Sequence, residues 1–89
     1  MTTVRFSPEG VRSLQRLPRP FLDEFNEAFS TIAKAGPSSP SLDTHQLSGA
    51  RSLWTLRIGP YRGIFRWDGA EARFIRFGHR RSVYARLPK

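Results

Sequence analysis

The sequence predicts an α+β fold in which an N-terminal strand and a helical hairpin pack on one face of an antiparallel β-sheet, leaving a basic face open. The apolar residues follow a period of 3.6 in the first part of the chain and a period of 2 in the later part. The later apolar runs are joined by very short connections, which make neighbouring strands antiparallel. At 89 residues, the chain is expected to form one domain over residues 1–89.

The first elements are a short strand at 3–6 and two helices. Ser7-Pro8-Glu9 begins the first helix with a hydroxyl N-cap, a proline at the first helical position and an acid in the first turn. The second helix begins at Arg19-Pro20, and Gly36-Pro37 ends it. Its apolar positions are Phe21, Leu22, Phe25, Ala28, Phe29, Ile32 and Ala33.

Three strands are predicted at 53–58, 61–67 and 72–78, after a connector at 36–41. Gly59-Pro60 separates the first two, and Asp68-Gly69 separates the last two. Asp-Gly between aromatic and β-branched runs indicates a hairpin.

Alternation along these strands assigns side chains to two faces. The face expected to pack on the helices carries Trp54, Leu56, Ile58, Tyr61, Phe65, Trp67, Ile75 and Phe77. The face expected to stay open carries Leu53, Thr55, Arg57, Arg62, Ile64, Arg66, Phe74, Arg76 and Arg80. Arg73 breaks the alternation and is expected near a strand end, while His79 is expected to point towards the helices.

The positive charge lies in the second part of the chain. Residues 1–50 carry five basic and five acidic residues, whereas residues 51–89 carry ten basic and two acidic residues, so the net charge of +8 arises from the latter. Nine of those ten bases are arginine, whose planar fork suits phosphate oxygens. The asymmetry favours a nucleic-acid partner. The alternative is a solubilising surface, although such surfaces usually mix signs.

Several classes of protein are disfavoured. The chain has no cysteine, and its two histidines, His45 and His79, are far apart in sequence, so we expect neither a metal nor another cofactor. It has no 18-residue apolar run, so we expect no membrane association. We expect a cytoplasmic protein.

Three motifs occur in order along the chain: Leu47-Ser48-Gly49, the strand pair from Leu53 to Phe65, and Gly78-His79-Arg80-Arg81-Ser82-Val83-Tyr84. In order and spacing, the chain resembles the RelE/ParE superfamily of toxins from toxin–antitoxin systems. The resemblance covers nearly the whole chain.

The resemblance implies the toxin of a type II toxin–antitoxin system. RelE-like members are endoribonucleases that cut mRNA on the ribosome by metal-independent attack of the 2′-OH, and the ending from Gly78 to Tyr84 favours this activity. The alternatives are a ParE-like inhibitor of DNA gyrase and a non-catalytic member that binds its antitoxin or autoregulates an operator. The implied partners are a cognate antitoxin, mRNA and the ribosome, with operator DNA bound only by the toxin–antitoxin complex.

By motif, the catalytic residues are predicted to be Arg62, Arg80 and Tyr84, and the chemistry of its imidazole adds His79 as a proton carrier. Tyr84 has the alternative role of sealing the sheet edge, and His79 that of a structural hydrogen-bond donor. Thr55 stands where some relatives have a lysine, so the general base stays unassigned; His45 is expected to be a solvated or packing residue. The residues predicted to bind RNA are Arg57, Arg66, Arg76 and Arg81.

Overall fold

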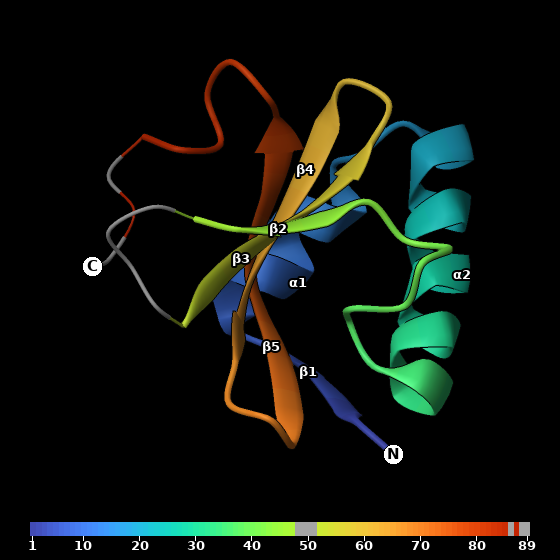
Figure 1. The fold of residues 1–89 in the computed structure, drawn as a ribbon. Helices are drawn as coiled ribbons and strands as arrows, with labels where there is room; N and C mark the ends of the chain where they lie inside the picture. The colour runs from blue at the N-terminus through green and yellow to red at the C-terminus, as the bar shows by residue number, and fades with distance from the viewer. Residues whose placement is uncertain (48–51, 86, 88–89) are drawn as a thin grey trace.

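The computed structural model describes residues 1–47, 52–85 and 87. These residues form two helices and one five-stranded sheet with strand order β1-β5-β4-β3-β2 (Figure 1). No helix among them is long and apolar enough to cross a bilayer. The elements are β1 (Thr3–Phe6), α1 (Pro8–Gln15), α2 (Arg19–Ala35), β2 (Thr44–Gln46), β3 (Leu53–Ile58), β4 (Tyr61–Trp67) and β5 (Glu71–His79).

The predicted α+β fold is confirmed, with two differences in the sheet. β1 pairs with β5 in parallel, so the sheet is mixed rather than wholly antiparallel. The three-residue edge strand β2, which pairs with β3, was not predicted because a segment that short shows no alternation.

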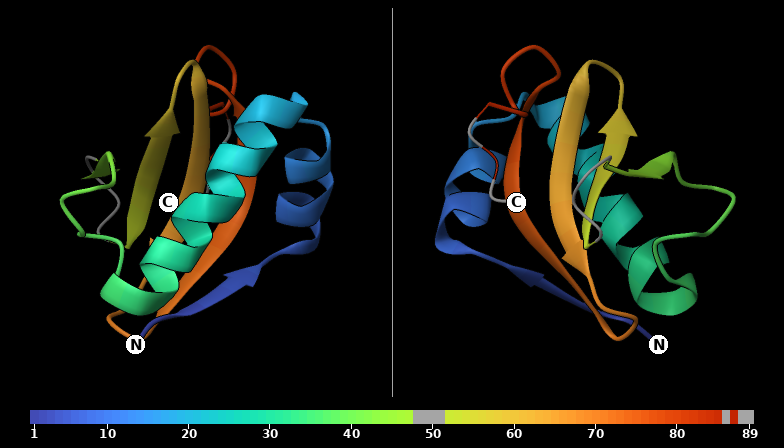
Figure 2. Two further views of the ribbon diagram at one scale, coloured as in Figure 1. Left: turned by 90° about the vertical axis from the view of Figure 1, so that its right-hand side faces the viewer. Right: turned by 60° about the vertical axis from the view of Figure 1, so that its left-hand side comes forward.

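α2 covers one face of the sheet, and the main core lies between them (Figure 2). Phe25 and Ile32 of α2 are fully buried against the sheet, together with Leu56, Phe65 and Phe74. Rings in this core pack edge to face, as Phe25 and Phe77 do with centroids 5.2 Å apart, and in stacks, as Phe74 and Phe77 do at 5.3 Å. The aromatic face of β3 and β4 therefore packs on the helices, as predicted.

A β-bulge changes the predicted faces of β5. Phe65 of β4 pairs with Phe74, whereas Ile64 pairs with Arg76, so Ile75 is skipped. Phe74 and Phe77 consequently both lie in the core under the helices, and Ile75 packs on the other side of the sheet. The predicted pairing of Ile75 with Phe77 on one face is wrong, because period-2 counting cannot anticipate an inserted residue.

α1 and its N-cap supply hydrogen bonds to β5 where its pairing with β1 ends. Ser7 donates from its backbone N to the Phe74 carbonyl oxygen (2.9 Å) and from Oγ to the Ile75 carbonyl oxygen (3.2 Å). The backbone N–H of Phe77 donates to Ser13 Oγ (2.9 Å). Two serines of the α1 region thus replace a neighbouring strand along this stretch of β5.

A substitution at Gly10 tests this close contact between α1 and β5. Gly10→Ala normally favours a helix, but a Cβ here would overlap the Phe74 carbonyl oxygen. We expect a loss of unfolding free energy of about 1–3 kcal/mol, measured by urea denaturation. Gln15→Ala, at an exposed position of the same helix, is the control and should be nearly neutral. A stabilised Gly10→Ala variant would contradict the packing described.

Candidate nucleic-acid interface

The sheet face turned away from the helices carries the arginines of the strands. Directly paired residues project to the same side of a sheet, and Leu53 and Ile64 identify this side because both pack away from α2. The arginines therefore share this face, as alternation predicted. Arg73 lies on it too, because the extra residue of the bulge puts Arg73 and Arg76 on the same side of β5. The three cross-strand rows are Leu53, Arg66 and Arg73; Thr55, Ile64 and Arg76; and Arg57, Arg62 and Gly78.

The sequence led us to expect that this face would be open, but residues that follow β5 cover part of it. After β5 the chain turns back (Figure 1), and Val83 packs with Leu53 and Ile64 in a second apolar cluster that includes Ile75. Val83, Leu53 and Ile64, which form the centre of this cluster, are almost fully buried. The apolar side chains of the far face need a cover, and residues 80–85, which we call the C-terminal segment, provide it.

Arg62, predicted to be catalytic, is buried at 9% exposure. Its Nη1 donates to the carbonyl oxygens of Gly59 (2.8 Å) and Tyr61 (2.9 Å). The side chain thereby satisfies carbonyls at the β3–β4 turn instead of standing free on the surface. A buried guanidinium needs such partners, and here they come from the backbone.

Two residues predicted to bind RNA are also engaged within the protein. Arg66 donates from Nη1 to Ser52 Oγ (3.0 Å). Arg76 forms an ion pair with Glu9, with 2.9 Å between Nε and Oε2. The predicted picture of five free guanidinium groups on this face is therefore wrong for Arg62, Arg66 and Arg76.

Among the arginines of β5 and of the C-terminal segment, Arg73, Arg80 and Arg81 keep available side chains. All three are exposed, and none of these side chains has a hydrogen bond or ion pair with another residue of the part of the chain that the structure describes. The backbone N–H of Arg80 donates to the Pro60 carbonyl oxygen (2.8 Å). This bond places Arg80 and Arg81 beside the β3–β4 turn.

Tyr84 lies over β3. Its Oη is 3.2 Å from Thr55 Oγ1, and the residue is 39% exposed. Val83, not Tyr84, is the member of the C-terminal segment at the centre of the apolar cluster. Tyr84 is partly exposed, and its hydroxyl lies on the buried Thr55, two residues from Arg57 along β3.

His79 ends β5 on the side of Tyr61, whose ring it meets edge-on with 5.7 Å between centroids. Its Nδ1 accepts a hydrogen bond from the backbone N–H of Arg81 (3.2 Å). The lone pair on Nδ1 is occupied, so the neutral ring carries its proton on Nε2. His79 thus holds the start of the C-terminal segment and presents an N–H donor.

His45 joins the site, although the sequence indicated a solvated or packing residue. It pairs with Thr55 across β2 and β3, and its Nε2 is 2.7 Å from both Arg57 Nη2 and Asp43 Oδ1. One imidazole nitrogen either accepts from Arg57 or donates to Asp43, so the group has two states that differ by a proton on Nε2. Only the pairing of β2 with β3 reveals this cluster.

The same cluster perturbs Asp43. The hydrogen bond from Arg57 holds the pKa of Asp43 below its ordinary value of 3.8; burial opposes this effect, and the hydrogen bond with His45 adds a smaller lowering. Arg57 Nη2 lies 3.2 Å from Asp43 Oδ1, and both side chains are about half exposed. This pair is therefore an exposed ion pair that a ligand can replace.

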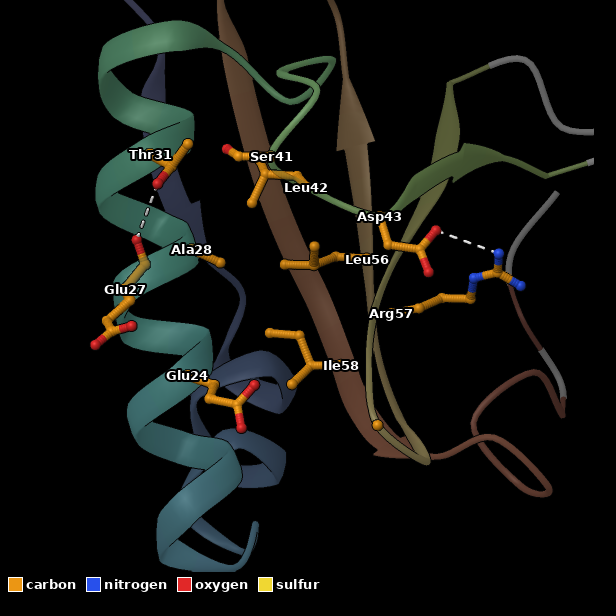
Figure 3. Close-up of a pocket in the computed structure, with 11 residues that line it drawn as sticks. Glu24, Glu27, Ala28, Thr31, Ser41, Leu42, Asp43, Leu56, Arg57 and Ile58 are labelled. Atoms are coloured by element: carbon orange, nitrogen blue, oxygen red, sulfur yellow. Dashed lines mark hydrogen bonds and ion pairs between the residues drawn. The ribbon is translucent and has the colours of Figure 1, made fainter.

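A groove of about 430 Å³ lies on the helix side of β3, between β3 and α2 (Figure 3). Figure 3 shows Glu24 and Glu27 along its α2 wall, with Asp43 and Arg57 at its far margin. The carboxylates of α2 repel phosphates, so this groove is unsuited to RNA. The arginine rows of β3, β4 and β5 belong to the other side of the sheet.

Three solved structures share this arrangement of helices and sheet. A chain of the RelB–RelE antitoxin–toxin complex from Methanococcus jannaschii has a TM-score of 0.82 and 21% identity, covering 94% of this chain and 99% of that chain. An archaeal RelE–RelB complex from Pyrococcus horikoshii OT3 gives 0.72 and 22%, covering 92% and 98%. YafQ from E. coli gives 0.75 and 10%, covering 94% and 99%.

No protein-family model matches the chain, and no curated protein matches it in sequence. The structural similarity extends over more than nine-tenths of this chain in each of the three comparisons. The chain therefore has the fold of the RelE-like toxins, as its motifs predicted.

The pKa of Asp43 provides a test of the cluster. Arg57→Gln should raise it towards 3.8, because the variant loses the charged donor, and His45→Ala should raise it less. A depressed pKa means that ionised Asp43 contributes stability above about pH 3.8, and that this contribution is lost as the pH falls through the folded-state pKa. Carbon-detected NMR titration of the carboxyl measures the shift. An unchanged pKa in Arg57→Gln would contradict the described contact.

Proposed function

We propose that this protein is the toxin of a type II toxin–antitoxin system and acts as an endoribonuclease that cleaves mRNA on the ribosome. The observation that carries the proposal is the meeting of His45, Arg57 and Tyr84 on one face of a RelE-like sheet. These groups have the chemistry that RNA cleavage requires, and the exposed Arg80 and Arg81 lie after β5, near the β3–β4 turn.

Cleavage of RNA by its own 2′-OH needs three operations on one phosphodiester. A base removes the 2′-OH proton, cations stabilise the charge on the non-bridging oxygens, and a proton reaches the leaving 5′-oxygen. The 2′-oxygen then forms a bond to phosphorus as the bond to the 5′-oxygen breaks. In this proposal the reaction proceeds without a metal ion.

Arg57 is suited to the phosphate. Its guanidinium faces an exposed carboxylate, Asp43, which an RNA phosphate can replace with little change in charge. Arg80 is proposed to bind the same phosphate, and Arg81 a neighbouring one. Arg62 is proposed to act by holding the turn between β3 and β4, because its donors already bind carbonyls there.

His45 is the proposed proton acceptor. When Arg57 turns to the phosphate, the lone pair on His45 Nε2 loses its donor and becomes free for the 2′-OH proton. Asp43, 2.7 Å away, then stabilises the imidazolium. Tyr84, fixed by Thr55, is proposed to stack on a base and orient the leaving oxygen, with His79 as the proton carrier expected from the chemistry of its imidazole.

A cognate antitoxin is the proposed protein partner. The two archaeal RelE structures described above are complexes with RelB. A flexible segment that is acidic and partly apolar fits the exposed arginines of this chain and would order as it binds. Operator DNA is proposed to be bound only by that complex, and the cytoplasm is the proposed location.

The first test is cleavage by an Arg57→Ala variant. Loss of a cation that stabilises the transition state should lower the rate about 10²–10³-fold. Primer extension on mRNA, with purified ribosomes and in expressing cells, measures it. Arg12→Ala is the matched control, because Arg12 is an exposed arginine on α1. A folded Arg57→Ala variant that cleaves like the wild type would refute the assignment, and DNA damage without mRNA cleavage would favour gyrase inhibition.

The second test is the salt dependence of RNA binding. An RNA oligonucleotide with 2′-O-methyl groups cannot be cut, so its dissociation constant is measurable by fluorescence anisotropy across salt concentrations. The logarithm of affinity should fall steeply with that of salt, and removal of one phosphate contact should reduce the slope by about 0.7. Arg81→Gln is the variant for this comparison. A flat dependence in the wild type would exclude phosphate recognition by the arginines.

A further inference from the structure

Arg76 connects three parts of the molecule. From β5 its Nε donates to Glu9 Oε2 at the start of α1 (2.9 Å), 67 residues earlier in the chain. Its Nη1 donates to the carbonyl oxygens of Val83 (3.1 Å) and Ala85 (2.5 Å) in the C-terminal segment. One guanidinium thus links the first helix, the sheet and the segment.

The two carbonyls held by Arg76 belong to the residues on either side of Tyr84. Because both are bound to the same nitrogen, the backbone at Tyr84 is fixed in position and direction. The ring itself is partly exposed, so packing alone does not determine where it lies. Its hydroxyl contact with Thr55 then depends on the backbone that carries it.

The backbone hydrogen bonds of the segment are mostly local. Ser82 and Val83 donate from their backbone N–H groups to the His79 carbonyl, and Ala85 donates to that of Ser82. These bonds shape a turn but do not attach residues 82–85 to the sheet. The segment is attached by the Arg80 backbone bond to Pro60 at one end, the Val83 side chain, the Tyr84 hydroxyl on Thr55 and the bonds from Arg76.

The ion pair with Glu9 is the reason why Arg76 binds backbone carbonyls rather than RNA. The side chain of Arg76 is 20% exposed, and the Glu9 carboxylate lies against its guanidinium. A guanidinium whose charge is matched by a carboxylate, and whose donors face carbonyls, is a poor ligand for an incoming phosphate. The RNA-binding role that the sequence predicted for Arg76 is therefore assigned to other arginines.

We propose that Arg76, held by Glu9, is a positioning residue that fixes the C-terminal segment so that Tyr84 lies on Thr55 beside Arg57. The consequence for RNA cleavage rests on the proposed function, whereas the effect on the segment does not. Arg76 acts through Tyr84 and does not itself contact the substrate.

Hydrogen exchange tests the effect on the segment without any RNA. In Arg76→Gln, the amides of Ser82, Val83 and Ala85 should exchange about ten-fold faster or more, because two hydrogen bonds from a charged donor are lost. Glu9→Gln, a surface change that keeps the shape of the side chain, should give a smaller acceleration at the same amides. Urea denaturation checks that both variants remain folded.

The matched control is Glu71→Gln, which removes the Arg5–Glu71 ion pair (2.8 Å) from the same sheet. Its exchange in the segment should equal that of the wild type. Unchanged exchange in Arg76→Gln, or equal acceleration in Glu71→Gln, would overturn the proposal.

A double-mutant cycle tests the consequence for cleavage. Arg76→Gln should slow the single-turnover rate about ten-fold or more in the wild type, but by less than about two-fold in a Tyr84→Ala background. An equal factor in both backgrounds means that Arg76 acts directly or through the whole fold, and the positioning role is then wrong. If the wild type cleaves no RNA, the proposed function fails, and the exchange measurement alone decides whether Arg76 holds the segment.

Discussion

Both faces of the sheet must bury apolar side chains, and the arrangement of the rest of the protein depends on this requirement. α2 covers the larger apolar face, where the phenylalanines gather. The other face offers a smaller patch centred on Leu53 and Ile64, which Val83 of the C-terminal segment covers, with Leu47 and Leu87 packed against the same cluster. Because Val83 is anchored there, the next residue, Tyr84, comes to lie over Thr55. The packing of a minor core, together with the hydrogen bonds from Arg76, thus places a polar ring at the candidate site.

The bulge in β5 has an effect beyond its immediate neighbours. It lets Phe74 and Phe77 enter the same core while Ile75 and Arg76 project to the other side. β1 pairs with β5 only as far as Phe74, and backbone groups of β5 beyond it bind serines of the α1 region. These contacts bring the first turn of α1, with Glu9, within reach of Arg76. The bulge and the contacts of α1 thus together place Arg76 where it joins the sheet, the first helix and the C-terminal segment.

Exposure and partners divide the arginines into two groups. Removing a guanidinium from water is unfavourable unless its donors find acceptors, and two largely buried arginines, Arg62 and Arg76, bind backbone carbonyls. Arg57 faces a carboxylate at the surface, where an ion pair contributes little and exchanges readily. Arg80 and Arg81 face solvent. The arginines available for a polyanion are thus those for which the protein itself has no structural use.

The sequence by itself determined the α+β fold, the two helices, the four longer strands and the side of the sheet on which the arginines lie. Those features follow from caps, turn residues and apolar periods, which act between neighbours in the chain. Only the tertiary structure decided which arginines are free, why Phe74 faces the helices, and that His45 stands beside Arg57. Residues distant in sequence come together because β2 pairs with β3 and because the C-terminal segment folds back onto the sheet. The spacing of apolar residues along the chain does not specify such long-range contacts.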